Sequence, residues 1–313
     1  MGEKKRLGRE FIRYVLPSML AFALSGIYSI ADGFFVGNEL GDSALTAINV
    51  AYPLTAFIQA TGTGIGIGGA VLFTLAAASA SPEGKRKYFG ISLVLLALSG
   101  AALTALIFLV SPPVLRIFGA EGETLALAEE YMRFIALGSL FQVLGTGLTP
   151  FIRNMGGTVT AMSAMIAGFV TNIVLDYLFV WVLPWGMTGA AVATVIGQAA
   201  TFCVCLGYLV VKKQKPDFRF GGRAFRFAGK TLLLGLSPFG LAFSPNFMLI
   251  FVNFSASAVG GQFALNCFAP VSYAISVVLL LLQGVSDGCQ PLVSREFGSG
   301  SARGARSVRN LAF

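Results

Sequence analysis

The sequence contains no histidine and few charged residues: Asp, Glu, Lys and Arg make up 12% of its 313 residues, against about 25% in a soluble globular domain. Without histidine, imidazole-ligated metals, histidine-based triads and histidine proton relays are excluded. The four cysteines lie within apolar stretches and lack the paired spacing of a zinc site: Cys203, Cys205, Cys267 and Cys289. We interpret them as small apolar residues embedded in a membrane.

The sequence consists largely of long apolar runs separated by short clusters of charged residues. Apolar residues make up 56% of the chain, and the runs between charge clusters reach the ~20 residues that a helix needs to cross a bilayer. The runs show no alternation of period two, which favours helices over a barrel. The sequence therefore predicts an all-α polytopic membrane protein. Eight spans are expected, at residues 14–36, 44–80, 88–110, 131–151, 159–183, 187–211, 231–254 and 263–293.

Basic residues gather on one predicted side of the membrane. Twenty of the 22 lysines and arginines lie in the N-terminal 13 residues, at 85–87, at 153, at 212–230 and at 295–309. Only Arg116 and Arg133 lie elsewhere. The positive-inside rule then predicts a multi-pass protein of the cytoplasmic membrane with both termini in the cytoplasm. The net charge of +8 is thus a signal of topology, and no nucleic-acid partner is needed to explain it.

Two parts of the chain resemble each other. Pro17 aligns with Pro238 at an offset of 221 residues, and short matches on either side keep nearly the same offset. The repeat unit therefore holds six spans, an even number, which gives a parallel repeat of the kind found in transporters. A complete pair of units would have ~440 residues, so we expect the chain to be truncated. The predicted parts are a six-helix N-lobe at 1–211, a basic cytoplasmic linker at 212–230 and a partial C-lobe with two spans and a cytoplasmic tail at 231–313.

Three carboxylates fall inside predicted spans: Asp32, Asp176 and Asp287. A charge at membrane depth costs about 2.5–3.5 kcal/mol, so such residues usually face an interior with partners. Asn172 stands four residues before Asp176, which puts both on one helical face. Thr194 lies at a similar depth in the next span.

These four groups near the outer side, Asp32, Asn172, Asp176 and Thr194, predict a site for a coupling cation. Carboxylate, amide and hydroxyl oxygens suit Na⁺. Two neighbouring carboxylates can alternatively bind and exchange protons. The repeat aligns Asp32 with a neutral Asn253, and the seventh span contains no acid. The site is therefore expected in the first half, and the choice between Na⁺ and H⁺ stays open.

Other polar and proline positions suggest moving or cavity-lining parts. Pro17 removes a backbone hydrogen bond and permits either a gating bend or a static kink. Gln283 and Asp287, followed by Gln290, form a polar stripe in the eighth span that either lines a central cavity or caps the cytoplasmic end. Gln142 in the fourth span is a further candidate for the cavity wall.

Two motif matches carry little weight. Gly64, Gly66 and Gly69 fit the dinucleotide-binding pattern G-x-G-x-x-G, but they lie in the middle of a span with no strand before them. We interpret them as sites of close helix packing. The glycosylation pattern at Asn253 abuts the membrane and is set aside.

Five segments stand out in order along the chain: Ile-Ala-Asp-Gly-Phe-Phe-Val-Gly at 30–37, Arg-Asn-Met-Gly-Gly at 153–157, Asn-Ile-Val-Leu-Asp at 172–176, Gly-Met-Thr-Gly-Ala-Ala-Val-Ala-Thr at 186–194 and Gln-Pro-Leu-Val-Ser at 290–294. In this order they resemble the signatures of MATE (multidrug and toxic compound extrusion) transporters.

The resemblance implies twelve spans in two six-helix lobes around a central cavity. It implies a secondary antiporter, not an enzyme, that exchanges organic cations for Na⁺ or H⁺ and uses no other cofactor. The family's cation-site residues fall on Asp32, Asn172, Asp176 and Thr194, and its helix-bending proline falls on Pro17. The implied partners are the lipid bilayer and small organic cations, and the oligomeric state stays open.

Three alternatives remain beside this reading. A flippase for lipid-linked precursors has a related architecture but needs a more basic cavity, and the predicted spans hold essentially one basic residue, Arg133. An intramembrane aspartyl protease would use Asp32 and Asp176, yet its Gly-x-Gly-Asp motif is absent. A non-transporting fragment or receptor would show no substrate-stimulated ion flux.

Overall fold

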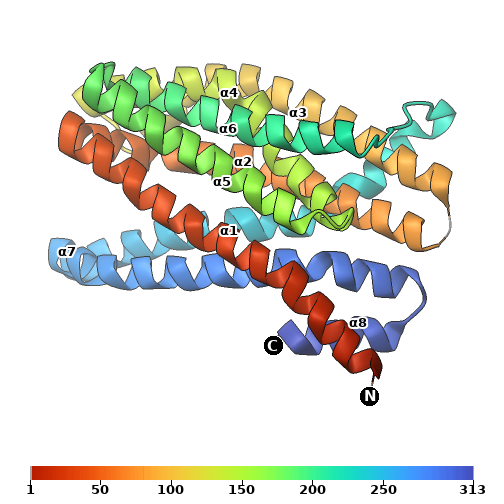
Figure 1. The fold of residues 1–313 in the computed structure, drawn as a ribbon. Helices are drawn as coiled ribbons and strands as arrows, with labels where there is room; N and C mark the ends of the chain where they lie inside the picture. Colours follow the sequence, from red (N-terminus) through yellow and green to blue (C-terminus); the bar gives the residue numbers. More distant parts are fainter. Residues whose placement is uncertain (1, 80, 313) are drawn as a thin grey trace.

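The computed structural model describes residues 2–79 and 81–312, with side chains described except at 2–5, 249, 250, 253, 254, 256–258, 260–270, 272–274 and 276. The described chain is helical and contains no strand (Figure 1). A π-helical segment, η1 (Tyr177–Val182), follows the fifth helix, and a short 3₁₀ turn, η2 (Gly221–Arg223), precedes the seventh. The α-helices are α1 (Gly2–Leu40), α2 (Asp42–Ala78), α3 (Pro82–Ile117), α4 (Gly122–Asn154), α5 (Thr158–Asp176), α6 (Gly186–Val211), α7 (Ala224–Gly298) and α8 (Ala302–Ala312).

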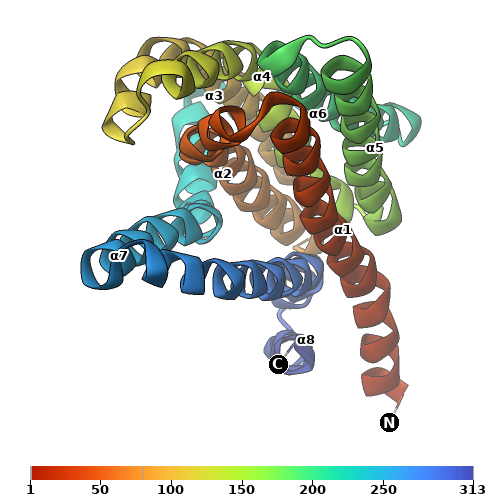
Figure 2. The same ribbon diagram turned by 90° about the vertical axis from the view of Figure 1, so that its left-hand side faces the viewer.

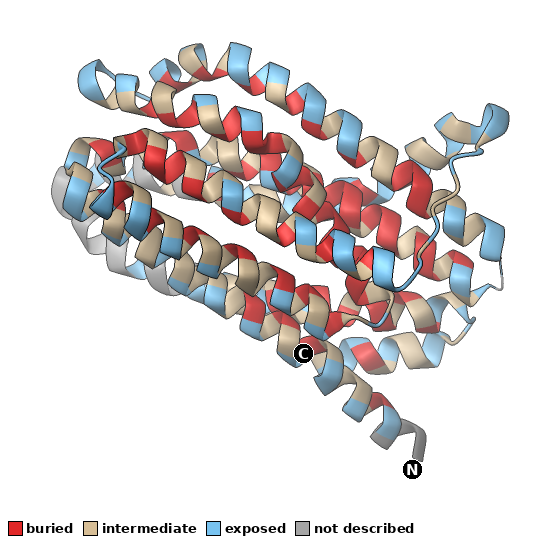
Figure 3. Ribbon diagram, turned by 45° about the horizontal axis from the view of Figure 1, so that its top comes forward, coloured by how far each residue is buried: buried red, intermediate tan, exposed pale blue. Residues whose placement is uncertain are grey.

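Eight segments of the described residues are long and apolar enough to cross a membrane, which confirms the predicted polytopic all-α class. Large apolar side chains such as Leu109 and Val211 are 75% and 77% exposed. Figure 3 shows exposed residues along the outer faces of the helices, and buried residues where helices face one another. Such an apolar exterior suits lipid and would be unfavourable in water.

The helices extend beyond the predicted spans. α1 begins at Gly2 rather than at residue 14, and α3 continues through two prolines to Ile117. The reason is that an apolar run marks the hydrocarbon layer, while the helix continues through polar turns at the headgroups. At the start of α3, Ser81 Oγ accepts a hydrogen bond from the Gly84 N–H at 3.3 Å, and Pro82 occupies the first helical position.

The helix α2 lies in the middle of the assembly. Figures 1 and 2 place α7 and α8 on the side opposite α3, α4 and α6. Gly64 of α2 touches α7 at Gly235, Gly66 touches α4 at Gly147, and Gly69 touches α3. A side chain at any of the three would overlap its neighbour. This confirms that the glycine pattern serves close helix packing.

Replacing Gly66 by Val should destabilise the protein by more than about 3 kcal/mol, because the added side chain meets the backbone of Gly147 and not a yielding side chain. Gly207→Ala is the matched control, since nothing lies within 4 Å of a Cβ at Gly207. Thermal unfolding in detergent should show a loss for the first variant alone. Equal midpoints for the two variants would contradict this packing.

The seventh and eighth candidate spans, Gly221–Met248 and Val277–Gly298, both lie within α7. The first packs on α2 through Gly235, and the second ends against α2 near Leu75. The second stretch also packs on α1 through Gly284. Thr231, near the start of the first stretch, lies against Gly68, and Gly298, at the end of the second, lies against Leu75, so the two stretches run in opposite directions past α2. The sequence predicted a break between spans at 255–262, but these residues belong to α7, since the segment contains no proline to interrupt helical hydrogen bonding. The side chains of Asn253 and Cys267 lie outside the described set. The two-lobe division itself stays a prediction.

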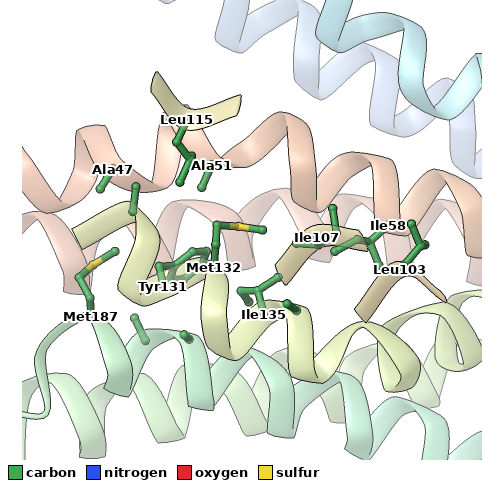
Figure 4. Packing of buried hydrophobic residues seen from close by; sticks show 14 of the residues in the cluster. Ala47, Ala51, Ile58, Leu103, Ile107, Leu115, Tyr131, Met132, Ile135 and Met187 are labelled. Carbon is green, nitrogen blue, oxygen red and sulfur yellow. The ribbon is translucent and has the colours of Figure 1, made fainter. Parts of the chain in front are cut away.

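Helices α2, α3, α4 and α6 enclose the largest apolar cluster (Figure 4). Tyr131 is the one tyrosine among the labelled side chains of this cluster, and it packs beside Met132 and Met187 near one end of α4. The labelled members are Ala47, Ala51, Ile58, Leu103, Ile107, Leu115, Tyr131, Met132, Ile135 and Met187. This packing fixes α4 and α6 beside the polar groups described next.

Candidate cation-coupling site

The helix α5 carries two polar side chains into the protein interior. Asn172 is 2% exposed and Asp176 is fully buried. The α-helical hydrogen bonding ends at Asp176, and the π-helix η1 follows, where the sequence predicted a regular helix over 159–183. π-helical turns in membrane and soluble proteins are frequent at functional sites. The apolar pattern gave no signal for this change, because it continues through both segments.

Glycines hold α5 and α6 in contact beside these polar groups. A Cβ at Gly168 would lie 2.8 Å from the Gly197 carbonyl oxygen, and a Cβ at Gly197 would lie 2.8 Å from the Gly168 carbonyl oxygen. This close approach lets the Asn172 Nδ2 donate to the Thr194 Oγ1 at 3.3 Å. The Thr194 hydroxyl in turn donates to the Ala190 carbonyl at 3.0 Å. Asn172 is thereby oriented so that its amide nitrogen donates a hydrogen bond, while its amide oxygen accepts none from a described residue.

Three buried oxygen atoms at this site have no hydrogen-bond donor among the described residues: Asn172 Oδ1 and both carboxylate oxygens of Asp176. Asp32 of α1 is half-buried, and its carboxyl group lies next to that of Asp176. The structure therefore brings together all four residues that the sequence predicted, Asp32, Asn172, Asp176 and Thr194. Their arrangement is rich in acceptors and poor in donors.

Two tyrosines, which were not identified from the sequence, lie beside the two acids. Tyr28 and Tyr131 lie near both Asp32 and Asp176. The Tyr28 ring stacks on Phe169 of α5, with ring centroids 5.0 Å apart. Tyr28 precedes Asp32 by one helical turn, a spacing that could have revealed it. Tyr131 had no such signal, because it comes from the start of α4 and meets the acids only in the folded protein.

The donor set fits a small hard cation or a proton. Carboxylate, amide and hydroxyl oxygens are ligands of hard cations, and an ionised buried carboxylate without a partner is strongly unfavourable. No group of three Asp, Glu, Cys or His side chains that could hold a metal occurs among the described residues. The two acids would therefore hold Na⁺ with neutral oxygens, or share protons between them.

A hydrogen bond from α5 satisfies the backbone carbonyl of α1 that Pro17 leaves without a helical partner. Pro17 has no N–H, so the carbonyl of Arg13 one turn earlier loses its helical partner. The Thr158 hydroxyl, at the start of α5, donates to this Arg13 carbonyl at 3.2 Å. On the other side, Gly284 and Gly288 let α7 approach the backbone of α1. The proline region is thus held between α5 and α7.

Replacing Thr158 by Val should cost about 1–2 kcal/mol of stability, because the Arg13 carbonyl is left unpaired. In a Pro17→Ala background the restored N–H can bond that carbonyl, so the same substitution should cost much less. Thermal unfolding of the two single variants and the double variant measures this coupling. Strictly additive losses would show that Thr158 does not serve the proline.

The polar stripe of α7 faces α4. Asp287 forms an ion pair with Arg153, with Oδ2 and Nη1 2.6 Å apart, and both side chains are nearly inaccessible, at 6% and 5% exposure. Gln283 Nε2 donates to Asp287 Oδ1 at 2.7 Å. Arg153 was expected to follow the fourth span, but it lies in the last turn of α4 and is buried. A predicted loop boundary is too imprecise to separate a last helical turn from a loop.

A second set of polar contacts continues this α4–α7 contact. Asn154 Nδ2 donates to Gln290 Oε1 at 2.7 Å, and Thr74 Oγ1 of α2 donates to Asn154 Oδ1 at 2.6 Å. Gln290 Nε2 also donates to Ser294 Oγ at 3.0 Å. Gln142 is buried elsewhere on α4. Asp287 and the stripe are therefore neutralised by helix α4 and lie apart from the Asp32–Asp176 site.

Comparison with known proteins identifies a consistent set of relatives. The MatE family model matches residues 17–178, a range that includes Asp32, Asn172 and Asp176. The multidrug export protein MepA of Staphylococcus aureus (strain MRSA252) is 27% identical over 319 residues, covering 96% of this chain and 67% of MepA. MepA of Staphylococcus saprophyticus is 26% identical over 309 residues, with the same coverage.

Solved structures share the fold. A crystal structure of a MATE protein in complex with MaL6 superposes with a TM-score of 0.91 at 24% identity, covering 98% of this chain and 68% of that one. A MOP superfamily transporter from Pyrococcus furiosus, described as having a binding pocket of reversed polarity, superposes with a TM-score of 0.90 at the same identity and coverage.

Proposed function

Because the chain belongs to the MatE family of multidrug efflux transporters, we propose that it exports organic cations across the cytoplasmic membrane in exchange for Na⁺ or H⁺. Members of this family are secondary transporters and not enzymes. The proposed coupling site consists of Asp32, Asn172, Asp176 and Thr194, with Tyr28 and Tyr131 at its edge.

The single observation that carries this proposal is the group of buried acceptor oxygens without donors on Asn172 and Asp176. Removing a partner from a buried charge typically costs about 3–5 kcal/mol. An ionised Asp176 in this position therefore needs a bound cation, and a neutral one needs a proton. Either way, the closed arrangement of α1, α5 and α6 is stable only while the ion is bound, which is the requirement for coupling.

Movement of α1 offers a way to release the ion. Asp32 stands about four helical turns after Pro17 on the same helix. Asn172 and Asp176, by contrast, are fixed to α6 by the glycine contact around Gly168. A change of bend at Pro17 would shift Asp32 relative to a stationary Asp176. The ion would then hold α1 in one of its two shapes, and its loss would favour the other.

An aromatic cluster between α2 and α7 supports a cationic substrate. The ring centroids of Phe57 lie 5.7 Å from Phe239 and 5.6 Å from Phe243, and Phe247 continues the row with 53% exposure. Aromatic faces attract organic cations. The flippase alternative needs several free positive charges instead. The predicted spans hold essentially one basic residue, Arg133, and Arg153, just beyond the fourth span, is neutralised by Asp287.

Transport assays in proteoliposomes test the proposal. A fluorescent organic cation should be extruded against its gradient when either Na⁺ or H⁺ is supplied as an inward gradient, and the effective ion identifies the coupling ion. The basic loops predict that the face bearing both termini is the cytoplasmic one. Extrusion should then be seen only from that face. Transport that ignores both ion gradients would refute coupling.

A further inference from the structure

A basic pocket lies where the start of α3 meets the chain that follows α6. It has a volume of about 300 Å³, and its lining includes four basic residues, Lys85, Arg86, Lys213 and Lys215, together with Phe73 and Phe89. None of the residues that line the pocket belongs to the coupling site. Nothing in the proposed transport cycle uses these residues.

The four positive charges have no carboxylate partners. None of the ion pairs found among the described residues includes them, and no acidic side chain lines the pocket. Lys85 instead lies with its Nζ 4.8 Å from the centre of the Phe73 ring. Four like charges gathered in one hollow repel one another, and a bound anion would relieve this repulsion.

Backbone contacts hold the pocket in shape. The Arg86 Nε donates to the Lys215 carbonyl at 3.2 Å, and the Asp217 N–H donates to the Arg86 carbonyl at 3.0 Å. Gly90 permits this approach, since a Cβ there would overlap the Asp217 carbonyl. The Arg86 Nη groups form no hydrogen bond with a described residue and remain free for a ligand. The site is thus formed before any ligand binds.

The backbone at Lys213 is a second, independent sign of function. Its φ is +48°, the one left-handed non-glycine residue in the described chain. The Gln214 N–H bonds the Leu209 carbonyl and the Lys213 N–H bonds the Val210 carbonyl, both at 3.0 Å. This is the helix ending at which glycine is usual, because a Cβ is disfavoured there. Lys213 thus carries a backbone cost that glycine would avoid, and it lines the pocket.

The position of the pocket indicates the source of the anion. Val210 and Val211, on the last turn of α6, are 67% and 77% exposed and form the lipid-facing surface. Lys213 follows within one turn, so the pocket lies at the depth of the headgroups. We infer that this pocket binds the phosphate of an anionic phospholipid in the leaflet on the side of the basic loops.

Native mass spectrometry of the full chain in a neutral detergent tests this site. The wild-type protein should retain one phosphatidylglycerol and prefer it to phosphatidylcholine. Lys213→Gly should weaken phosphatidylglycerol binding about fivefold, as expected for one lysine at a membrane surface. Because glycine suits the left-handed backbone, the thermal midpoint of this variant without lipid should equal or exceed that of the wild type.

Lys212→Gln is the matched control, because it removes an exposed charge one residue away without removing a pocket side chain. Its affinity should stay within twofold of the wild type. Lys85→Gln combined with Lys215→Gln removes two charges and should weaken binding further, by about 25-fold. Equal binding of both lipids, equal losses for Lys212→Gln and Lys213→Gly, or displacement of the lipid by millimolar inorganic phosphate would overturn the inference.

Discussion

Asp176→Asn is expected to abolish ion-driven export and to weaken binding of the coupling ion more than about 100-fold, the equivalent of losing one charged partner of a buried ion. The substitution keeps the shape of the side chain and removes the charge that attracts the cation or carries the proton. Asp32→Asn should act in the same direction, with a smaller effect, because Asp32 is less buried than Asp176.

Ion binding can be measured on the purified protein through its own tryptophans. The chain contains two, and Trp181 lies one turn beyond Asp176 in η1. Its ring centroid is 6.0 Å from Tyr177 and 5.9 Å from Phe35 of α1. In a Trp185→Phe background, titration with Na⁺ or with acid should change the Trp181 fluorescence, and Asp176→Asn should remove the change.

Glu39→Gln serves as the control for this titration. Glu39 is an exposed acid two helical turns beyond Asp32 on α1, so its loss alters the charge of the same helix without touching the site. Its titration curve should match that of the parent. A normal ion response in the Asp176→Asn protein would show that the ion binds elsewhere.

Asp287→Asn is expected to destabilise the protein by about 3–5 kcal/mol, because Arg153 then stays buried at 5% exposure without an opposite charge. Replacing both partners by apolar residues, Arg153→Met with Asp287→Leu, should recover most of this loss. Thermal unfolding of the two single variants and the pair gives the coupling energy directly.

The more accessible pair of Arg116 and Glu129, whose side chains are 67% and 25% exposed, is the matched control for this cycle. Their charged atoms are 4.0 Å apart. Glu129→Gln should therefore change stability by less than about 0.5 kcal/mol. If Asp287→Asn were equally mild, the α4–α7 ion pair would not be the buried contact that the structure describes.

The coupling residues could be predicted because acids in apolar runs stand out. Asp32 and Asp176 are conspicuous in spans that contain almost no other charge, and the i, i+4 spacing joins Asn172 to Asp176 on one face. The glycines of α2 were predicted as packing sites for a related reason, since small residues in a span have few other uses.

Contacts between residues far apart in the chain could not be predicted from the sequence. Arg153 finds Asp287 at a separation of 134 residues, and Thr158 meets the carbonyl of Arg13 through a bond that no local pattern encodes. Tyr131 likewise reaches the acids from a different helix. The polar stripe around Asp287 indicated that this buried acid needs a polar or charged partner, but the sequence did not identify Arg153 as that partner.

Exchange of a drug for an ion at Asp32 and Asp176 requires that the two fluxes be coupled, and recording drug and ion in the same vesicles measures this coupling. Proteoliposomes loaded with ²²Na⁺, or with a pH-sensitive dye, are exposed to an organic cation added outside. Uptake of the cation should evoke outward movement of Na⁺ or H⁺ in the parent protein, and none when both acids are replaced by Asn. Drug movement without ion movement, or unchanged exchange in the double variant, would contradict it.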